Sequence, residues 1–315
     1  MLNQFKPTNL IVIMGPTAGG KTLLAAHLAA RLNSGVISAD SRQVYKGMDI
    51  GTGKDLADYT VNGTVVPYYL IDIVEAGTKY NVYEYQKDFV KVFNQLLTID
   101  KIPVLCGGSG LYIEAVLKGY RLISVPVNEP LRAELAEKDD DELIKLLQSC
   151  KKLHNRTDTS TKKRIIRAIE IEIYYSDHAQ QEVDYPEIHP LLIAVSFDRK
   201  RQREKITERL HDRLNNGMID EVKKLLNKGI SSEDLIYYGL EYKFITQYLT
   251  GGLTYDHMFQ LLNSSIHQFA KRQMTWLRKM ERDGAAIHWI DGELSLPEKL
   301  DKIKNVIDSF NDTGK

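Results

Sequence analysis

The sequence contains little of what marks several classes of protein. Its two cysteines, Cys106 and Cys150, are too few and too far apart for a disulfide framework or a cysteine-based zinc site. The apolar run near the N-terminus, Leu10 to Met14, is shorter than the hydrophobic region of a signal peptide or a membrane span. We therefore expect a protein of the reducing cytoplasm that does not associate with a membrane.

The sequence also lacks an excess of charge of either sign. Its 42 Lys and Arg residues balance its 42 Asp and Glu residues, so its formal net charge is zero. Any binding to nucleic acid must therefore depend on local basic patches rather than on an overall field. Apolar residues make up 43%, which is typical of a globular protein, and 315 residues suffice for one large core with a smaller added domain.

Short apolar runs predict the strands of a sheet. They span residues 9–15, 35–40, 102–108, 191–198 and 285–291. Helical stretches separate most of them, which is the pattern of a parallel sheet wrapped by helices. We predict an α/β fold of the P-loop NTPase type with about five strands, and we expect ligand groups at the carboxyl ends of the strands.

Two long segments do not fit a minimal core of this kind. Residues 121–188 contain an acidic run and the helical pattern "TKKRIIRAIEIEIYY", and residues 203–282 are again mostly helical. We predict a catalytic core made of residues 1–120 and 189–315, to which the second segment adds helices. Residues 121–188 are predicted to form a mainly helical insertion.

The stretch "GPTAGGKT", residues 15–22, has the spacing of a phosphate-binding loop, G-x-x-x-x-G-K-[ST]. Successive backbone N–H groups of such a loop form an anion-binding concavity at the N-terminus of a helix. Lys21 adds a positive charge, and the hydroxyl of Thr22 can reach a phosphate or a magnesium ion. A chance glycine-rich turn is disfavoured because a strand pattern precedes the loop and a helix pattern follows it. The loop indicates a polyphosphate or diphosphate without identifying the molecule.

Two acidic residues follow apolar runs and are candidates for the chemistry. Asp40 ends "GVISAD", and Asp72 ends "YYLID". Either carboxylate can organise magnesium beside a phosphate loop, as in a nucleotide-hydrolysing enzyme. Asp40 can alternatively act as a general base, or it can simply cap the turn that follows it.

Segments spread along the chain resemble one enzyme family. In order they are "GPTAGGKT", "ADSRQVYKGMDIGTGK", "YYLIDIV", "YNVYEYQKDF", "PVLCGGSGLY", "GMIDEVKKLL" and "FAKRQMTWLR". The sequence is similar in these segments to the tRNA dimethylallyltransferases, also called tRNA isopentenyltransferases, over residues 10 to 280. The stretch "DSRQVYKGMDIGT" is the most specific of them.

The resemblance implies a transfer reaction. The dimethylallyl group of dimethylallyl diphosphate would move to the exocyclic 6-amino nitrogen of the adenosine directly 3′ of the anticodon of a tRNA, with release of diphosphate. The implied cofactor is Mg²⁺ and the implied partner is the tRNA anticodon stem-loop. No obligate protein partner is evident from the sequence.

The resemblance also implies roles for single residues. The donor diphosphate would lie on Gly15, Pro16, Thr17, Ala18, Gly19, Gly20, Lys21 and Thr22. Asp40 matches the general base of the family, and Arg209 matches an arginine that neutralises diphosphate. Ser109 stands where the family usually has threonine and keeps its hydroxyl. The implied catalytic set is thus Lys21, Thr22, Asp40, Ser109 and Arg209, with Thr22 as the ligand of Mg²⁺.

Two further groups match segments that contact tRNA in the family. The first, around the target nucleotide, comprises Asp40, Ser41, Arg42, Gln43 and Ser109; the second, in the insertion, comprises Lys163, Arg164, Ile165, Ile166 and Arg167. The chain departs from the family at Tyr68 and Tyr69, where histidines are common, at Lys205, which is usually arginine, and at residues 237–244, where Gly239 is kept. The tRNA contacts from residues 237–244 cannot be carried over.

The helical pattern around "HQFAKRQMTWLRKMER" places Ile266, Phe269, Gln273 and Leu277 on one stripe. The opposite side carries Lys271, Arg272, Arg278, Lys279 and Arg282. This basic side is either an ordinary solvated face or a surface that binds RNA phosphates. We predict that Phe269 and Trp276 belong to the core rather than stack on bases.

Two other functions are compatible with part of the pattern. A small-molecule kinase using ATP would place the loop on β- and γ-phosphates and Asp72 or Asp40 on magnesium. A non-catalytic RNA-binding protein would bind tRNA without turnover, but the intact loop, Asp40 and Arg209 argue against it.

Overall fold

The computed structural model describes residues 7–151, 159–178 and 185–312. Its internal contacts divide the chain into two compact units. The large unit comprises residues 1–119 and 186–315, and the small unit comprises residues 120–185. We describe each unit separately.

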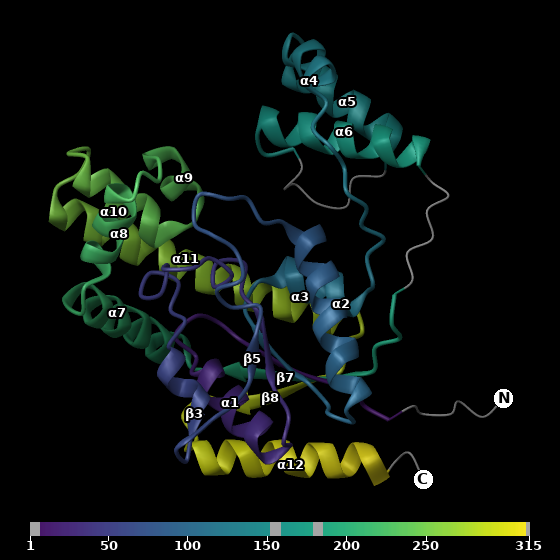
Figure 1. Ribbon diagram of the computed structural model, residues 1–315, viewed down its shortest axis with the longest axis vertical. Coiled ribbons are helices and arrows are strands. Elements are labelled where there is room, and N and C mark those ends of the chain that lie inside the picture. The colour runs from purple at the N-terminus through teal and green to yellow at the C-terminus, as the bar shows by residue number, and fades with distance from the viewer. Residues whose placement is uncertain (1–6, 152–158, 179–184, 313–315) are drawn as a thin grey trace. The chain divides into compact units, whose positions relative to one another are not determined.

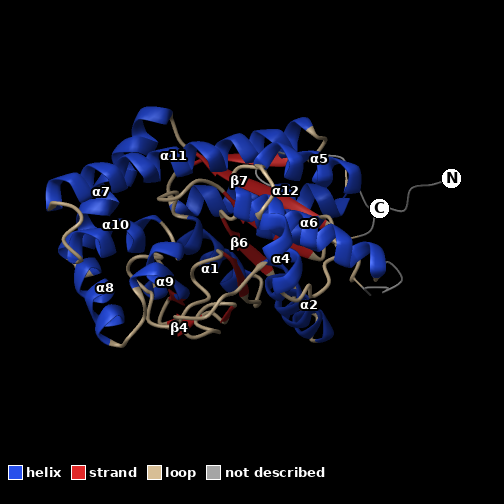
Figure 2. Cartoon of the chain, turned by 90° about the horizontal axis from the view of Figure 1, so that it is seen from above, coloured by secondary structure: helices blue, strands red, loops and turns tan. Residues whose placement is uncertain are grey.

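A parallel sheet of six strands forms the centre of the large unit, in the order β5-β2-β6-β1-β7-β8. Figure 2 shows its strands β6 and β7 in red among the surrounding helices. The strands are β1 (Leu10–Met14), β2 (Val36–Ala39), β5 (Tyr68–Tyr69), β6 (Val104–Gly107), β7 (Pro190–Ser196) and β8 (Ile287–Asp291). The predicted parallel α/β fold is confirmed, and each apolar run forms a strand. The sheet has one strand beyond the five apolar runs assigned to it: the two-residue edge strand β5, which begins the run "YYLID".

The alternation of side chains along the strands explains why both faces of the sheet carry helices. On β1, Leu10, Val12 and Met14 contribute to one hydrophobic core, whereas Ile11 and Ile13 contribute to another. The second core is closed by α1 (Lys21–Arg31) and α12 (Leu296–Asp312), which Figure 1 shows on the same side of the sheet. A strand that is apolar on both faces is expected in a sheet that is covered on both sides.

The first core is closed by the remaining helices of the large unit, and β3 (Thr60–Val61) and β4 (Thr64–Val65) form a separate antiparallel hairpin. These helices are α2 (Val82–Thr98), α3 (Gly110–Leu117), α7 (Arg199–Asn215), α8 (Met218–Asn227), α9 (Ser232–Tyr237), α10 (Leu240–Leu249) and α11 (Tyr255–Arg282). Among the described residues, no helix combines the length and the apolarity that crossing a bilayer requires.

The small unit is a bundle of α4 (Glu129–Ala136), α5 (Asp140–Cys150) and α6 (Lys162–Asp177). Its hydrophobic core includes Leu143, Leu147 and Ile165. Beside this core lies the buried carboxylate of Glu170, which accepts hydrogen bonds from the Arg132 side chain at 2.8 and 3.0 Å and from the Asn128 N–H at 2.7 Å. Burial raises the pKa of Glu170, but these hydrogen bonds and one from Arg167 outweigh it and hold the pKa at about 2.

Candidate active site

The phosphate loop joins β1 to α1 at the carboxyl edge of the sheet. Gly15 begins it with φ of 153°, and a Cβ atom at this position would lie 2.7 Å from the carbonyl oxygen of Val195 on β7. A glycine is therefore required where the loop leaves the sheet. The loop ends at Gly20, after which α1 begins with Lys21 and Thr22, so that unpaired N–H groups of the helix N-terminus face the loop.

The ammonium of Lys21 folds back over this loop. Its Nζ donates a hydrogen bond to the carbonyl oxygen of Pro16 at 2.7 Å, and the side chain is half-buried. Burial lowers the pKa of Lys21 to about 8, and the neighbouring guanidinium of Arg209 acts in the same direction, whereas the carboxylate of Asp40 opposes it. A cation that is poorly hydrated in this way gains by accepting an anion beside it.

Asp40 directly follows β2, at the same edge of the sheet. Its Oδ1 accepts a hydrogen bond from the Arg42 N–H at 2.9 Å, so the turn-capping interaction is present. Within the described part of the chain, Oδ2 accepts no hydrogen bond from the protein. The capping role and a role as proton acceptor are therefore compatible, because they use different oxygens.

Ser109 lies beside the Asp40 turn. Its Oγ accepts a hydrogen bond from the Ser41 N–H at 3.1 Å and lies 3.4 Å from the Ser41 hydroxyl. The N–H of Ser109 donates to the carbonyl oxygen of Ala39, the last residue of β2, at 3.3 Å. The structure thus brings together the loops that follow β2 and β6, as expected for neighbouring parallel strands.

Two glutamines hold Thr17 from opposite sides, and the sequence did not single out either for this role. Gln273 of α11 accepts a hydrogen bond from the Thr17 N–H at 2.8 Å and donates one to the carbonyl oxygen of Gly108 at 3.0 Å. Gln202 of α7 donates to the carbonyl oxygen of Thr17 at 2.6 Å. A polar residue within an otherwise apolar helical stripe was the available signal for Gln273; Gln202 gave none.

A pocket lies between the phosphate loop and the helices α7, α10 and α11. It is lined by Thr17, Ala18, Ile206, Arg209, Leu210, Arg213, Glu241 and Ile266. The Arg209 guanidinium is ion-paired with Asp55, whose other oxygen lies 4.0 Å from Nη2 of Arg213. The predicted arginine is therefore placed against the phosphate loop.

Asp72 and Gln43 are committed to internal contacts. Asp72 is ion-paired with Nζ of Lys54, a fully buried lysine that also binds Asp49 at 2.6 Å and the carbonyl oxygen of Tyr45 at 2.7 Å. Asp72 thus neutralises a buried cation through its Oδ1. The Gln43 amide is buried between Ser38 Oγ at 2.9 Å and the Gly53 carbonyl at 3.1 Å, so it holds the loop after Asp40 rather than facing a ligand.

The predicted tRNA-contacting segment of α6 divides into exposed and buried residues. Lys163 and Arg164 are exposed. The side chains of Ile165 and Ile166 are buried in the core of the small unit, because the helical period turns these positions inward, so only their backbone remains available to the predicted tRNA contact. Arg167 is bound to Glu170 and to the carbonyl oxygen of Val125 at 2.9 Å.

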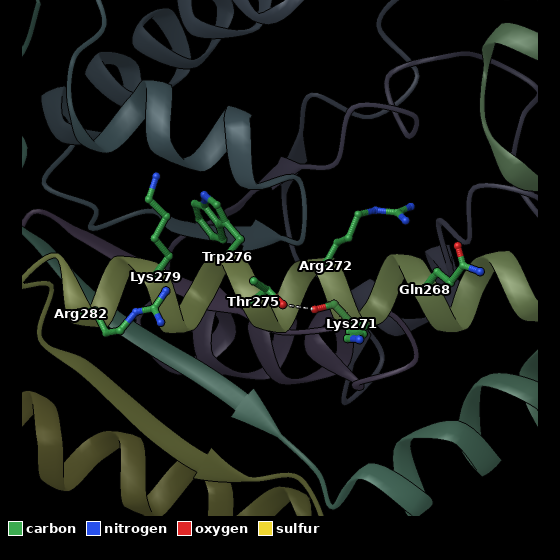
Figure 3. Close-up of a pocket in the computed structure, with 7 residues that line it drawn as sticks. All are labelled: Gln268, Lys271, Arg272, Thr275, Trp276, Lys279 and Arg282. Carbon is green, nitrogen blue, oxygen red and sulfur yellow. Dashed lines mark hydrogen bonds between the residues drawn. The ribbon is translucent and has the colours of Figure 1, made fainter. Parts of the chain in front are cut away.

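One face of α11 forms a broad basic pocket, which we call the α11 basic surface. It is lined by Gln268, Lys271, Arg272, Thr275, Trp276, Lys279 and Arg282. Figure 3 shows Arg272, Trp276 and Lys279 extending from the same side of the helix. Trp276 is half-buried against the core and donates to Glu114 at 3.3 Å, as a core residue should.

The stripe opposite this face is correct at Ile266, Gln273 and Leu277, which are buried, and wrong at Phe269. The Phe269 ring is 37% exposed and lies 5.9 Å from the guanidinium carbon of Arg272. An aromatic ring at the border of a stripe can be covered by a cation instead of by the core.

Comparison with known proteins assigns the family. The model of the family described as IPP transferase matches residues 43–280. A tRNA dimethylallyltransferase 2 of Bacteroides fragilis is 57% identical over 302 residues, covering 96% of this chain and 99% of the relative. A tRNA dimethylallyltransferase 2 of Phocaeicola vulgatus is 56% identical over 303 residues with the same shares covered.

A solved structure agrees with this assignment. The full-length tRNA isopentenylpyrophosphate transferase of Bacillus halodurans superposes with a TM-score of 0.70 at 30% identity, over 98% of both chains. The sheet, the phosphate loop and the Asp40 turn described above thus belong to a chain that aligns with these relatives over 96% of its length. This chain belongs to the IPP transferase family.

Proposed function

We propose that this protein transfers the dimethylallyl group of dimethylallyl diphosphate to the 6-amino nitrogen of the adenosine directly 3′ of the anticodon in a tRNA. One observation carries the proposal: in a chain of this family, a phosphate loop with Lys21 and a carboxylate, Asp40, lie at the same edge of the sheet, after the two strands β1 and β2 that flank β6. The first can hold a diphosphate leaving group, and the second can accept the proton of the attacking amine.

The donor side of the reaction uses the phosphate loop. The loop N–H groups, Lys21 and Arg209 would surround the diphosphate, whose negative charge grows as the carbon–oxygen bond of the donor breaks. Positive groups held in place before the reaction stabilise that charge without reorganisation. This loop therefore lowers the barrier by acting on the leaving group, not by hydrolysing a nucleotide.

The acceptor side uses Asp40. The 6-amino nitrogen of adenine is a weak nucleophile because its lone pair is delocalised into the ring. As the new nitrogen–carbon bond forms, one amine proton passes to the free oxygen of Asp40. The hydrogen bond from the Ser41 N–H to Ser109 Oγ holds the backbone of this turn and so orients the Asp40 carboxylate.

Magnesium fits the donor site through few protein ligands. Among residues 7–151, 159–178 and 185–312, no group of three or more His, Cys, Asp or Glu side chains is arranged to hold a metal ion. Mg²⁺ commonly takes one or two protein ligands and completes its shell with phosphate oxygens and water. The Thr22 hydroxyl is the protein ligand we propose, and the bound ion would neutralise part of the diphosphate charge.

Basic surfaces on each unit are suited to the RNA. Lys163 and Arg164 are exposed on α6 of the small unit, and α11 offers Lys271 and Arg272, the latter 5.9 Å from the centre of the exposed ring of Phe269. Cations that track phosphates next to an aromatic ring are typical of single-stranded RNA sites. An anticodon loop suits such a site because its bases leave their stack more easily than those of a duplex.

A transfer assay without ATP tests the proposal. Incubating the protein with unmodified tRNA, Mg²⁺ and labelled dimethylallyl diphosphate should yield tRNA labelled on adenosine. A kinase would instead need ATP and a small acceptor, and the membership of this chain in the IPP transferase family disfavours that alternative. Absence of label on tRNA, together with phosphate transfer from ATP, would refute the proposal.

The variant Asp40→Asn tests the role of the base. The amide keeps an oxygen that can accept from the Arg42 N–H, but it cannot take a proton. We expect transfer to fall by about a hundredfold or more, with tRNA affinity nearly unchanged. The exposed Asp308 on α12 gives a matched control, Asp308→Asn, which should transfer at the wild-type rate.

A further inference from the structure

Arg213 is a largely buried cation, and one of its two terminal nitrogens, Nη2, has no hydrogen-bond acceptor among the described residues. It lies on α7, one turn after Arg209, and its side chain is 15% exposed. Its Nη2 is buried and, within the described part of the chain, has no hydrogen-bond acceptor; the nearest carboxylate oxygen, on Asp55, is 4.0 Å away. Asp55 is instead bound by Arg209.

Such a group is costly unless something accepts its hydrogen bonds. A guanidinium carries five N–H donors and is removed from water here. Burial lowers the pKa of Arg213, and the like charge of Arg209 lowers it further. A protein retains an arrangement of this kind where a ligand supplies the missing acceptors, because the ligand then gains hydrogen bonds that the empty site lacks.

The backbone around the two arginines is built to hold them close together. The backbone of Gly53 packs against both guanidinium groups. A Cβ atom at this position would lie 1.6 Å from Nη2 of Arg213 and 2.8 Å from Nη2 of Arg209, so only glycine leaves room for them. The preceding turn is fixed by Glu221, whose carboxylate accepts hydrogen bonds from the N–H groups of Asp49 at 2.8 Å and of Gly51 at 3.0 Å. The fixed backbone of this turn therefore packs against both guanidinium groups and restricts their positions.

The position of Arg213 connects it to the phosphate loop. Arg213, Arg209 and the loop residues Thr17 and Ala18 line the same pocket, to which Glu241 also contributes. We propose that Arg213 is a second guanidinium for the donor's diphosphate and binds it together with Arg209 and Lys21. This inference rests on the proposed function, since it assigns a further residue to the same donor site.

Glu241 adjusts the charge of this pocket. Burial raises the pKa of Glu241, while Arg213 opposes that rise. The carboxylate partly compensates Arg213 when no anion is bound, and it repels a diphosphate when one arrives. Removing the charge of Glu241 should therefore change diphosphate affinity in the opposite direction from removing the charge of Arg213.

Calorimetric titration of the full-length protein with inorganic diphosphate, with Mg²⁺ present, tests the proposal. Arg213→Met removes the charge and keeps a long side chain; we expect the Kd to rise at least about tenfold, the loss for a charge-assisted hydrogen bond. Arg203, an exposed arginine on the same helix, gives the control Arg203→Met, which should bind like the wild type. Equal affinity of the Arg213→Met variant, the control and the wild type would overturn the proposal.

A second variant guards against an effect on folding alone. Glu241→Gln should lower the Kd for diphosphate several-fold, which a purely structural role for the Arg213–Glu241 pair does not predict. If Arg213→Met fails to fold, the Glu241→Gln result decides: an unchanged or higher Kd overturns the inference. tRNA affinity, measured on each folded variant, should stay within about twofold of the wild type, since the proposed contact of Arg213 is with the donor and not with the RNA.

The failure of this inference is distinguishable from failure of the proposed function. A wild-type protein that binds diphosphate and prenylates tRNA, with Arg213→Met unchanged, refutes the inference alone. Parallel titrations with dimethylallyl diphosphate and with ADP identify the source of the diphosphate, and tighter binding of the allylic compound is expected. Tighter binding of ADP without prenyl transfer would instead count against the proposed function.

Discussion

Gln273 provides the sharpest test of how this site is held together. Its side chain connects the phosphate loop, through the Thr17 N–H, to the loop after β6, through the carbonyl oxygen of Gly108. The substitution Gln273→Met preserves the length of the side chain but removes both hydrogen bonds. Because Gln273 is 8% exposed, water cannot readily replace them.

The magnitude follows from these contacts. Each net hydrogen bond contributes about 1 kcal/mol, and a buried group left without a partner costs about 1–3 kcal/mol. Gln202 still holds the Thr17 carbonyl, which limits the displacement of the loop. We expect the free energy of unfolding to fall by about 2–4 kcal/mol, and the KM for the donor to rise at least about tenfold because the loop N–H groups lose their alignment.

The assay combines urea denaturation with steady-state kinetics of tRNA prenylation. Gln260, exposed on the same helix and outside the α11 basic surface, provides the control Gln260→Met, for which both quantities should match the wild type. A Gln273→Met variant that loses stability but keeps its donor KM would show that Gln273 supports the fold only. A variant that keeps both would refute the reasoning from the two hydrogen bonds.

Three further predictions concern charge. Because the pKa of Lys21 is about 8 in the free protein, affinity for dimethylallyl diphosphate should be constant below pH 8 and fall as the pH rises above it. Lys21→Arg, which stays protonated, should remove this dependence. The double variant Lys163→Ala, Arg164→Ala should weaken tRNA binding and flatten its salt dependence, with donor affinity unchanged; an unaltered salt slope, measured by filter binding, would remove α6 from the RNA surface. The pKa of Glu170 is about 2 in the folded protein and near 4.5 when unfolded, so its stabilising effect is complete above pH 4.5 and is lost as the pH falls towards 2. Relative to Glu170→Gln, the wild type should lose up to about 3 kcal/mol of unfolding free energy over that interval, measured by urea titration at each pH.

Local pattern was sufficient for the parts of this protein that depend on neighbouring residues. The strand 9–15, the phosphate loop and the helix after it follow one another in the chain, so their periodicities predict them directly. The edge strand β5 was not predicted, because two residues are too few to show the alternation of apolar and polar side chains that marks a strand. The burial of the Ile165 and Ile166 side chains follows from the helical spacing, which the match to a tRNA-contacting segment does not take into account.

The contacts that assemble the site join distant parts of the chain and have no local pattern. Gln273 binds Thr17 across 256 residues, and Arg209 binds Asp55 across 154. The partner of Asp72 was likewise hidden, because Lys54 lies in a different loop and nothing in its surroundings marks it as buried. Sequence therefore predicts which residue types carry the chemistry better than it predicts which of them are already engaged.

The same contacts couple the donor and acceptor sides of the site. Gln273 ties the phosphate loop to Gly108, the adjacent Ser109 binds the Ser41 N–H next to Asp40, and the chain between Asp40 and Asp55 ends at the carboxylate that holds Arg209. A shift of the phosphate loop would therefore move the proposed general base, Asp40, as well as the cations that we propose for the diphosphate. Since attack by the amine and departure of the diphosphate must occur along one line, a closed set of contacts of this kind serves the reaction better than separate loops would.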